Sequence, residues 1–220
     1  MTKETLLTLT DPRSAAAEAF RTLRTNLLFA GLERPLQTLL VTSAAPDGDG
    51  PASKTQTLAN LGVVMAQGGR RTILVDCDLR RPRLHEVFGV PAAPGFSDWM
   101  MGTAETAPAL TPTGVDALTL LPAGAPAPTP ADLLSSRRLQ TLITHLKQQA
   151  EIVLFDGPPL LSMSDGALLA ANLDGALLVV SAGHTRRDHA LRAKELLDKI
   201  HVRVVGAVLT NAAGDALSAY

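Results

Sequence analysis

Cysteine, tyrosine and tryptophan are scarce in this chain, which contains one residue of each. The lone cysteine, Cys77, excludes a disulfide within the chain. The lone tyrosine, Tyr220, is also the last residue. The segment Met1–Asp11 has neither a basic leader nor the apolar stretch of a signal peptide, so we expect a cytoplasmic protein.

Net charge and long apolar runs are missing as well. The 20 basic and 21 acidic residues nearly cancel, so the chain offers no field that would attract nucleic acid or anionic lipid. No apolar run approaches the roughly 18 residues that a membrane span needs. We therefore expect no nucleic-acid partner and no direct membrane insertion, while a partner that is itself a membrane protein stays open.

Apolar residues are plentiful, and they are arranged as alternating strands and helices. At 46% hydrophobic over 220 residues, the composition fits one globular domain over 1–220, with flexible ends at 1–13 and 214–220. Apolar periodicity predicts strands at 72–75, 118–121, 152–155, 175–181 and 204–209, and helices at 14–30, 54–67, 131–149 and 186–199. The strands are apolar on both faces, which predicts a doubly wound, mainly parallel α/β sheet with helices on both faces.

The stretch 37–60 predicts a buried strand, a loop with glycine and proline, and a helix start. Its segment Gly48–Thr55 spells G-D-G-P-A-S-K-T, close to the phosphate-binding pattern G-x-x-x-x-G-K-(S/T), in which the lysine and the hydroxyl serve phosphate and Mg²⁺. Ser53 stands where the second glycine belongs, and its Cβ would crowd a backbone that needs positive φ. The loop alone leaves open either a nucleotide site or a glycine-rich connection.

Acidic residues follow two of the predicted strands. Asp76 and Asp78 end the strand 72–75, and Asp156 ends the strand 152–155, at the edge where open α/β sheets bind ligands. They are candidates for organising Mg²⁺, against the alternatives of a helix cap, a solvated loop acid or a turn. Asp165 follows at a helix start, where capping is the simplest explanation and contact with the active loop the alternative.

The helix 14–30 carries charges at a regular spacing. Glu18, Arg21 and Arg24 recur every three residues along one side. From the spacing alone, a solvated face with some charge pairing is the favoured interpretation.

Taken in order, these stretches resemble the cytoplasmic catalytic domain of the bacterial tyrosine kinases of capsule and exopolysaccharide systems. The resemblance covers nearly the whole chain and is carried by E-A-F-R-T-L-R-T-N-L from Glu18, V-T-S-A-A-P from Val41, I-L-V-D-C-D-L-R-R-P from Ile73, P-A-D-L-L-S-S from Pro130 and F-D-G-P-P from Phe155. It implies a P-loop NTPase fold, shared with the cell-division and partition ATPases, and the use of ATP and Mg²⁺ to phosphorylate tyrosine.

The resemblance also implies roles for individual residues. Catalysis would fall to Lys54, Asp76 and Asp78, and metal binding to Thr55, Asp76 and Asp156. The nucleotide would be bound by Gly48, Gly50, Ser53, Lys54, Thr55 and Gln56. Glu18, Arg21 and Arg24 would pack subunits into a homo-oligomeric ring. Members without a membrane span are activated by a separate transmembrane polysaccharide co-polymerase, which implies recruitment to the inner face of the membrane.

Two features depart from the family pattern. The loop between Pro46 and Lys54 is longer by roughly four residues, and Gln56 stands where a second hydroxyl is common. The C-terminal tyrosine cluster is absent, which leaves Tyr220 as the sole self-acceptor. The alternatives are a catalytically impaired scaffold that self-associates and binds the transmembrane partner, and a partition-type ATPase, disfavoured because no lysine lies near the first glycine of the loop.

Overall fold

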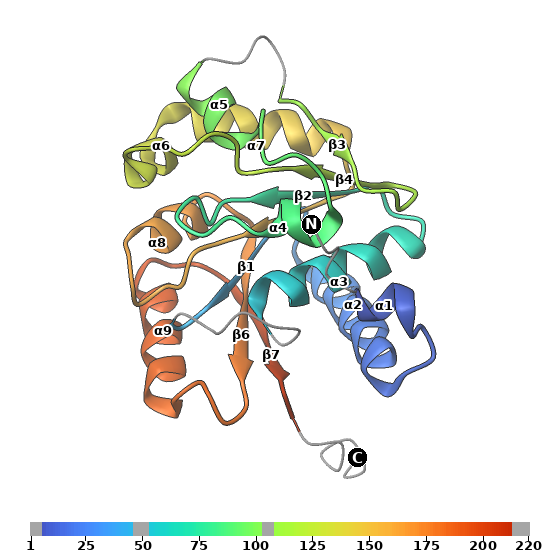
Figure 1. The fold of residues 1–220 in the computed structure, drawn as a ribbon. Coiled ribbons are helices and arrows are strands. Elements are labelled where there is room, and N and C mark those ends of the chain that lie inside the picture. The colour runs from blue at the N-terminus through green and yellow to red at the C-terminus, as the bar shows by residue number, and fades with distance from the viewer. Residues whose placement is uncertain (1–5, 46–52, 103–107, 213–220) are drawn as a thin grey trace.

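The computed structural model describes residues 6–45, 53–102 and 108–212. Within these ranges the strands form one sheet in the order β3-β4-β2-β5-β1-β6-β7 (Figure 1). The strands are β1 (Thr38–Ser43), β2 (Thr72–Asp76), β3 (Thr111–Pro112), β4 (Leu118–Leu121), β5 (Ile152–Asp156), β6 (Gly175–Ser181) and β7 (Val204–Thr210). All neighbouring strands are parallel except the short β3, which pairs antiparallel with β4.

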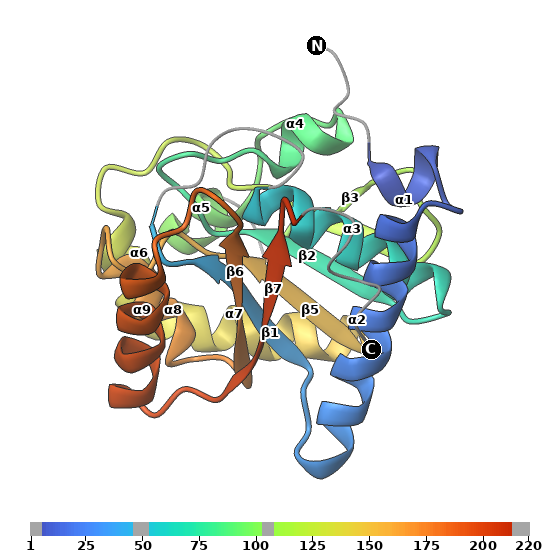
Figure 2. The ribbon, with the colours of Figure 1, turned by 90° about the horizontal axis from the view of Figure 1, so that it is seen from below.

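Helices cover both faces of this sheet. They are α1 (Leu7–Thr10), α2 (Ala15–Glu33), α3 (Lys54–Gln67), α4 (Leu84–Phe88), α5 (Phe96–Met101), α6 (Pro130–Ser135), α7 (Arg137–Gln149), α8 (Asp165–Ala170) and α9 (Arg187–Lys199). One buried cluster joins the sheet to α2, α3 and α4, and the other joins it to α5 through α9. Figure 2 shows α8 and α9 on one side and α1, α2 and α3 on the other. The predicted doubly wound, mainly parallel fold is confirmed.

Helix α3 lies at the centre of its layer, and every residue from Lys54 to Ala66 is buried. The helix is buried all round because the sheet covers one side and α1, α2 and α4 lie against the others. Its N-cap is Ser53, whose hydroxyl accepts a hydrogen bond from the backbone N–H of Gln56 at 3.3 Å. The residue that departs from the glycine pattern therefore starts the helix.

The N-terminal segment differs from the sequence prediction. Residues 1–13 were expected to be flexible, but over the described part, from residue 6 on, the chain forms α1 and buries Leu6 and Thr8. The side chain of Asn60, on α3, accepts from the backbone N–H of Thr8 at 3.0 Å and from its hydroxyl at 2.9 Å. Composition and local pattern carried no sign of this long-range contact.

The helix predicted at 131–149 is also different, because it is divided in two. Ser136, with φ −76° and ψ 151°, is extended and separates α6 from α7. Thr129, the residue before α6, makes no side-chain cap. Among the described helices, none combines the length and the apolarity that crossing a membrane requires.

Candidate active site

The ends of three adjacent strands form the floor of the site. β5 lies between β1 and β2, and the register places Asp76 directly beside Asp156, which in turn pairs with Val41. Both carboxylates are completely buried. The carboxyl ends of parallel strands share one edge of a sheet, so two strand-terminal acids meet here although 80 residues separate them.

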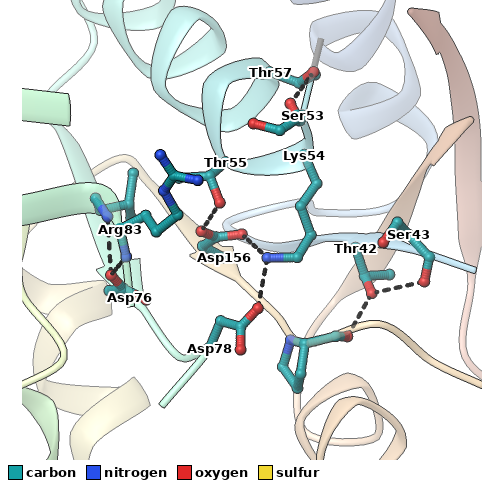
Figure 3. Close-up of polar contacts among 12 residues, drawn as sticks. Thr42, Ser43, Ser53, Lys54, Thr55, Thr57, Asp76, Asp78, Arg83 and Asp156 are labelled. Carbon is teal, nitrogen blue, oxygen red and sulfur yellow. Dashed lines mark hydrogen bonds and ion pairs between the residues drawn. The ribbon is translucent and has the colours of Figure 1, made fainter. Parts of the chain in front are cut away.

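Lys54 extends from the first turn of α3 into this acidic edge (Figure 3). Its Nζ lies 2.9 Å from Oδ2 of Asp78 and 3.0 Å from Oδ1 of Asp156. The Thr55 hydroxyl donates to the other oxygen of Asp156 at 2.7 Å. Lys54 thus bridges Asp78 and Asp156, and the Asp156 carboxylate accepts from both Lys54 and Thr55.

Asp76 is held differently. Its Oδ2 accepts from the backbone N–H groups of Arg83 at 3.1 Å and Leu84 at 3.0 Å, at the start of α4 (Figure 3). Its Oδ1 is buried without a hydrogen-bond partner. A fully buried carboxylate oxygen without a donor is costly, which marks this atom as a candidate ligand for a cation.

Burial and mutual repulsion raise the pKa of two of these acids. Burial is the main cause for Asp76, reinforced by the charge of Asp156, and its pKa lies well above the ordinary value. Burial also raises the pKa of Asp156, against the opposing effects of Lys54 and the Thr55 hydroxyl. Burial by itself lowers the pKa of Lys54, but Asp156 and Asp78 outweigh it and the net shift is upward, so Lys54 stays protonated.

Cys77, between the two acids of the β2 end, is not part of this chemistry. Burial and the neighbouring carboxylates raise the pKa of its thiol well above the usual range. The neutral thiol is a poor nucleophile, so Cys77 is an inert, buried residue.

The donor set suits Mg²⁺. Carboxylate and hydroxyl oxygens are its preferred ligands, and Asp76, whose Oδ1 has no hydrogen-bond partner, pairs in the sheet with Asp156, the acceptor of the Thr55 hydroxyl. Among the described residues, no three acidic, histidine or cysteine side chains form a metal cage by themselves. Mg²⁺ usually takes only one or two carboxylates and completes its shell with water and phosphate, so the residues present fit a Mg²⁺–nucleotide complex.

The other residues predicted for nucleotide binding and as phosphate acceptor add little to this site. Gly48, Gly50 and Tyr220 lie outside the described residues. Ser53 has φ −70°, a conformation that any residue adopts, so the strain argued for its Cβ is absent here. Gln56 is buried in the first turn of α3.

Glu18, Arg21 and Arg24 lie on α2, away from the acidic edge. Arg21 pairs with Glu18 within the chain at 2.6 Å, and Arg24 donates to the carbonyl oxygen of Val64 at 2.9 Å. Val64 is ten residues after Lys54, which places it about 15 Å further along α3. Arg24 therefore joins α2 to the far end of the helix.

Sequence reasoning missed one contact next to the site. Capping was the simplest explanation for Asp165 and contact with the active loop the alternative. Its carboxylate accepts from Nε of Arg80 at 2.9 Å, and the N-cap residue of α8, Ser164, has no side-chain cap. The two residues are 85 positions apart, and only the shared sheet edge brings them together.

Solved structures with the same fold identify its class. The kinase domain of the Escherichia coli tyrosine kinase ETK matches with a TM-score of 0.90 at 30% identity, over 100% of this chain and 85% of that one. The septum site-determining protein MinD from Pyrococcus horikoshii, complexed with Mg-ADP, matches at 0.65 and 24% identity, which shows the fold alone. The protein has the doubly wound α/β fold of the P-loop NTPases.

Sequence relatives narrow that class. No family model matches the chain. The tyrosine-protein kinase YwqD of Bacillus subtilis is 35% identical over 204 residues, which cover 93% of this chain and 84% of the relative. The tyrosine-protein kinase Wzc of Salmonella typhimurium is 32% identical over 94% of this chain, which matches only 28% of that protein. The chain belongs to the family of bacterial tyrosine-protein kinases.

Proposed function

We propose that the protein is an ATP- and Mg²⁺-dependent protein-tyrosine kinase that regulates the synthesis or export of capsule or exopolysaccharide. The observation that carries the proposal is the position of Lys54, at the start of the helix after the loop, between Asp78 and Asp156. A lysine there can neutralise the terminal phosphates, and the acids can organise the metal. The pathway is taken from the family to which the chain belongs.

The residues divide the work by position. Thr55 and Asp156 would hold Mg²⁺ directly or through water, and Oδ1 of Asp76, which has no hydrogen-bond partner, would support the same cation. The bound metal supplies charge neutralisation of the phosphates in the transition state. Asp78 would orient and deprotonate the tyrosine hydroxyl; its 6% exposure, against 0% for Asp76 and Asp156, supports this choice among the three acids. Most of this catalysis is positioning and electrostatic stabilisation.

Calorimetric titration with ATP, with and without Mg²⁺, tests nucleotide binding. We expect binding that depends strongly on Mg²⁺, because three neighbouring carboxylates oppose phosphate until a cation offsets them. Asp78→Asn should retain binding and lose transfer, whereas the exposed control Asp132→Asn should retain both. Transfer is measured on a tyrosine peptide and by intact mass, where the one tyrosine, Tyr220, allows one added phosphate that Tyr220→Phe removes. Phosphate on serine or threonine would contradict the proposed reaction.

A second candidate is a non-catalytic scaffold of the same family. This candidate is favoured because Lys54 is already paired with Asp78 and Asp156, and a phosphate must compete with both carboxylates for the lysine. The loop between Pro46 and Lys54 is also longer than the family pattern by roughly four residues. Absence of ATP binding even in excess Mg²⁺ would select this candidate over the kinase.

We further propose that the protein forms a homo-oligomeric ring, as the family resemblance implies. A transmembrane polysaccharide co-polymerase would recruit this ring to the inner face of the membrane. The oligomer is proposed to use Glu18 and Arg21 on α2. Both are accessible, with exposed side-chain fractions of 65% and 33%. Arg24 is a poorer probe because it also bonds Val64.

The double variant Glu18→Ala, Arg21→Ala should therefore shift the protein to monomer in light scattering at moderate salt. Exposed charge pairs add little to the stability of a subunit, so folding should be nearly unchanged. The matched control is Asn26→Ala, an exposed change on the same helix. A parent that is monomeric at every concentration, or a variant with the parent's mass, contradicts the interface.

A further inference from the structure

An ion pair between Arg80 and Asp165 joins two loops next to the candidate active site. The loop after β2 carries Asp78 and then Arg80, while the loop after β5 leads from Asp156 to Asp165. Nε of Arg80 lies 2.9 Å from Oδ2 of Asp165. The exposed side-chain fractions are 43% for Arg80 and 3% for Asp165, so a buried carboxylate depends on a half-exposed guanidinium. Removing one partner of a buried charge pair leaves the other uncompensated.

The Asp165 end of the pair is firmly held. It opens α8, where the next residue, Gly166, packs so closely that a Cβ there would lie 2.9 Å from the carbonyl oxygen of Pro158. That same oxygen accepts from the hydroxyl of Thr42, on β1, at 2.8 Å. Asp165 is thereby fixed relative to β1 and to the segment that follows Asp156.

The Arg80 end is close in the chain to Asp78. The backbone N–H of Arg81 donates to the carbonyl oxygen of Asp78 at 2.9 Å, which closes a turn that contains Arg80. In the described part of the chain, Lys54 is the ion-pair partner of the Asp78 carboxylate. A phosphate at Lys54 competes for that lysine and weakens its hold on Asp78.

We propose that Arg80 and Asp165 are a positioning pair, which keeps the turn of Asp78 at the site when a nucleotide phosphate draws Lys54 away. The inference rests on the proposed function, because it assumes that phosphate binds beside Lys54. Neither residue touches the reacting atoms. They act through the backbone of the turn, and their loss should affect the chemical step more than the binding of ATP.

Kinetics of Arg80→Gln, Asp165→Asn and the double variant test the pair. We expect kcat for tyrosine transfer to fall about 3- to 10-fold while KM for ATP stays within about twofold, and the double variant to lose no more than either single one. Arg80→Lys should restore part of the loss. The matched control Arg81→Gln changes the adjacent exposed arginine, whose side chain makes no ion pair among the described residues, and should behave as the parent. Parental kcat in the single variants, or additive losses, overturns the proposal.

Amide exchange in the nucleotide-free protein separates this inference from the proposed function. Both single variants should speed exchange at the amide of Arg81 about 3- to 10-fold, with no change at Val153 in β5. If exchange at Arg81 is faster in the single variants while the parent neither binds ATP nor transfers phosphate, the proposed function is rejected and the loop-positioning pair is kept. Unchanged exchange at Arg81 overturns the pair whatever the parent does. Arg80→Gln, at a half-exposed site, keeps the test possible if Asp165→Asn does not fold.

Discussion

Lys54→Met should destabilise the protein by about 3–5 kcal/mol, because removing one partner leaves buried charges uncompensated. The lysine is 4% exposed and offsets both Asp78 and Asp156, while Asp76 lies next to them. Without the ammonium group, burial and repulsion would raise the pKa values of Asp76 and Asp156 further. Chemical denaturation at pH 7.5 measures the loss.

The same variant should lose measurable binding of Mg-ATP in calorimetry, since the group that meets the terminal phosphates is gone. The control Lys194→Met removes an exposed lysine that pairs with Asp198, and should cost less than about 1 kcal/mol. Acidification should reduce the loss in Lys54→Met, because protonated carboxyls no longer need the cation. Parental stability and ATP affinity in this variant would show that Lys54 does not organise the site.

Asp76→Asn should have the opposite effect on stability, with a gain of about 1–2 kcal/mol near pH 8. The amide oxygen can still accept from the N–H groups of Arg83 and Leu84, and the buried charge that faces Asp156 is removed. Nucleotide binding should lose much of its Mg²⁺ dependence. The control Asp132→Asn, on the exposed side of α6, should leave the free energy of unfolding close to that of the parent.

The pH dependence of this gain follows from the raised pKa of Asp76. Between the unfolded value of about 4 and the raised native value, the folded state holds more protons than the unfolded state, so stability falls as pH rises. Asp156 has the same sign. Denaturant titrations should therefore show the parent losing stability with rising pH above about 4, with a shallower slope in Asp76→Asn. Equal slopes in the two proteins would show that Asp76 does not cause the loss of stability with rising pH.

Mg²⁺ provides an independent check on the same residue. If the orphaned Oδ1 of Asp76 helps to bind the cation, Mg²⁺ should stabilise the parent near pH 8 through preferential binding to the native state. The stabilisation should be smaller in Asp76→Asn. An equal response in the two proteins would move the metal site away from Asp76.

The fold was predictable because its signals are local. Apolar strands such as 152–155 and 175–181 are buried on both faces, and their alternation with helices specifies a parallel sheet. The predicted boundaries failed where local pattern is weak: Ser136 interrupts an apolar periodicity that continues through it, and α1 is short and depends on contacts with α3.

The candidate site was predictable only in part. The sequence by itself determined which acids end which strands, because Asp76 and Asp156 directly follow apolar runs, and it determined that Lys54 and Thr55 start a helix. Tertiary structure decided which charges meet: Lys54 with Asp78 and Asp156, and Arg80 with Asp165. Strand order sets those pairings, and it depends on packing between segments that are distant in the chain, such as Lys54 and Asp156, 102 positions apart. Burial and repulsion act between neighbours in space, so the shifted pKa values and the unpartnered oxygen of Asp76 have no counterpart in the linear sequence.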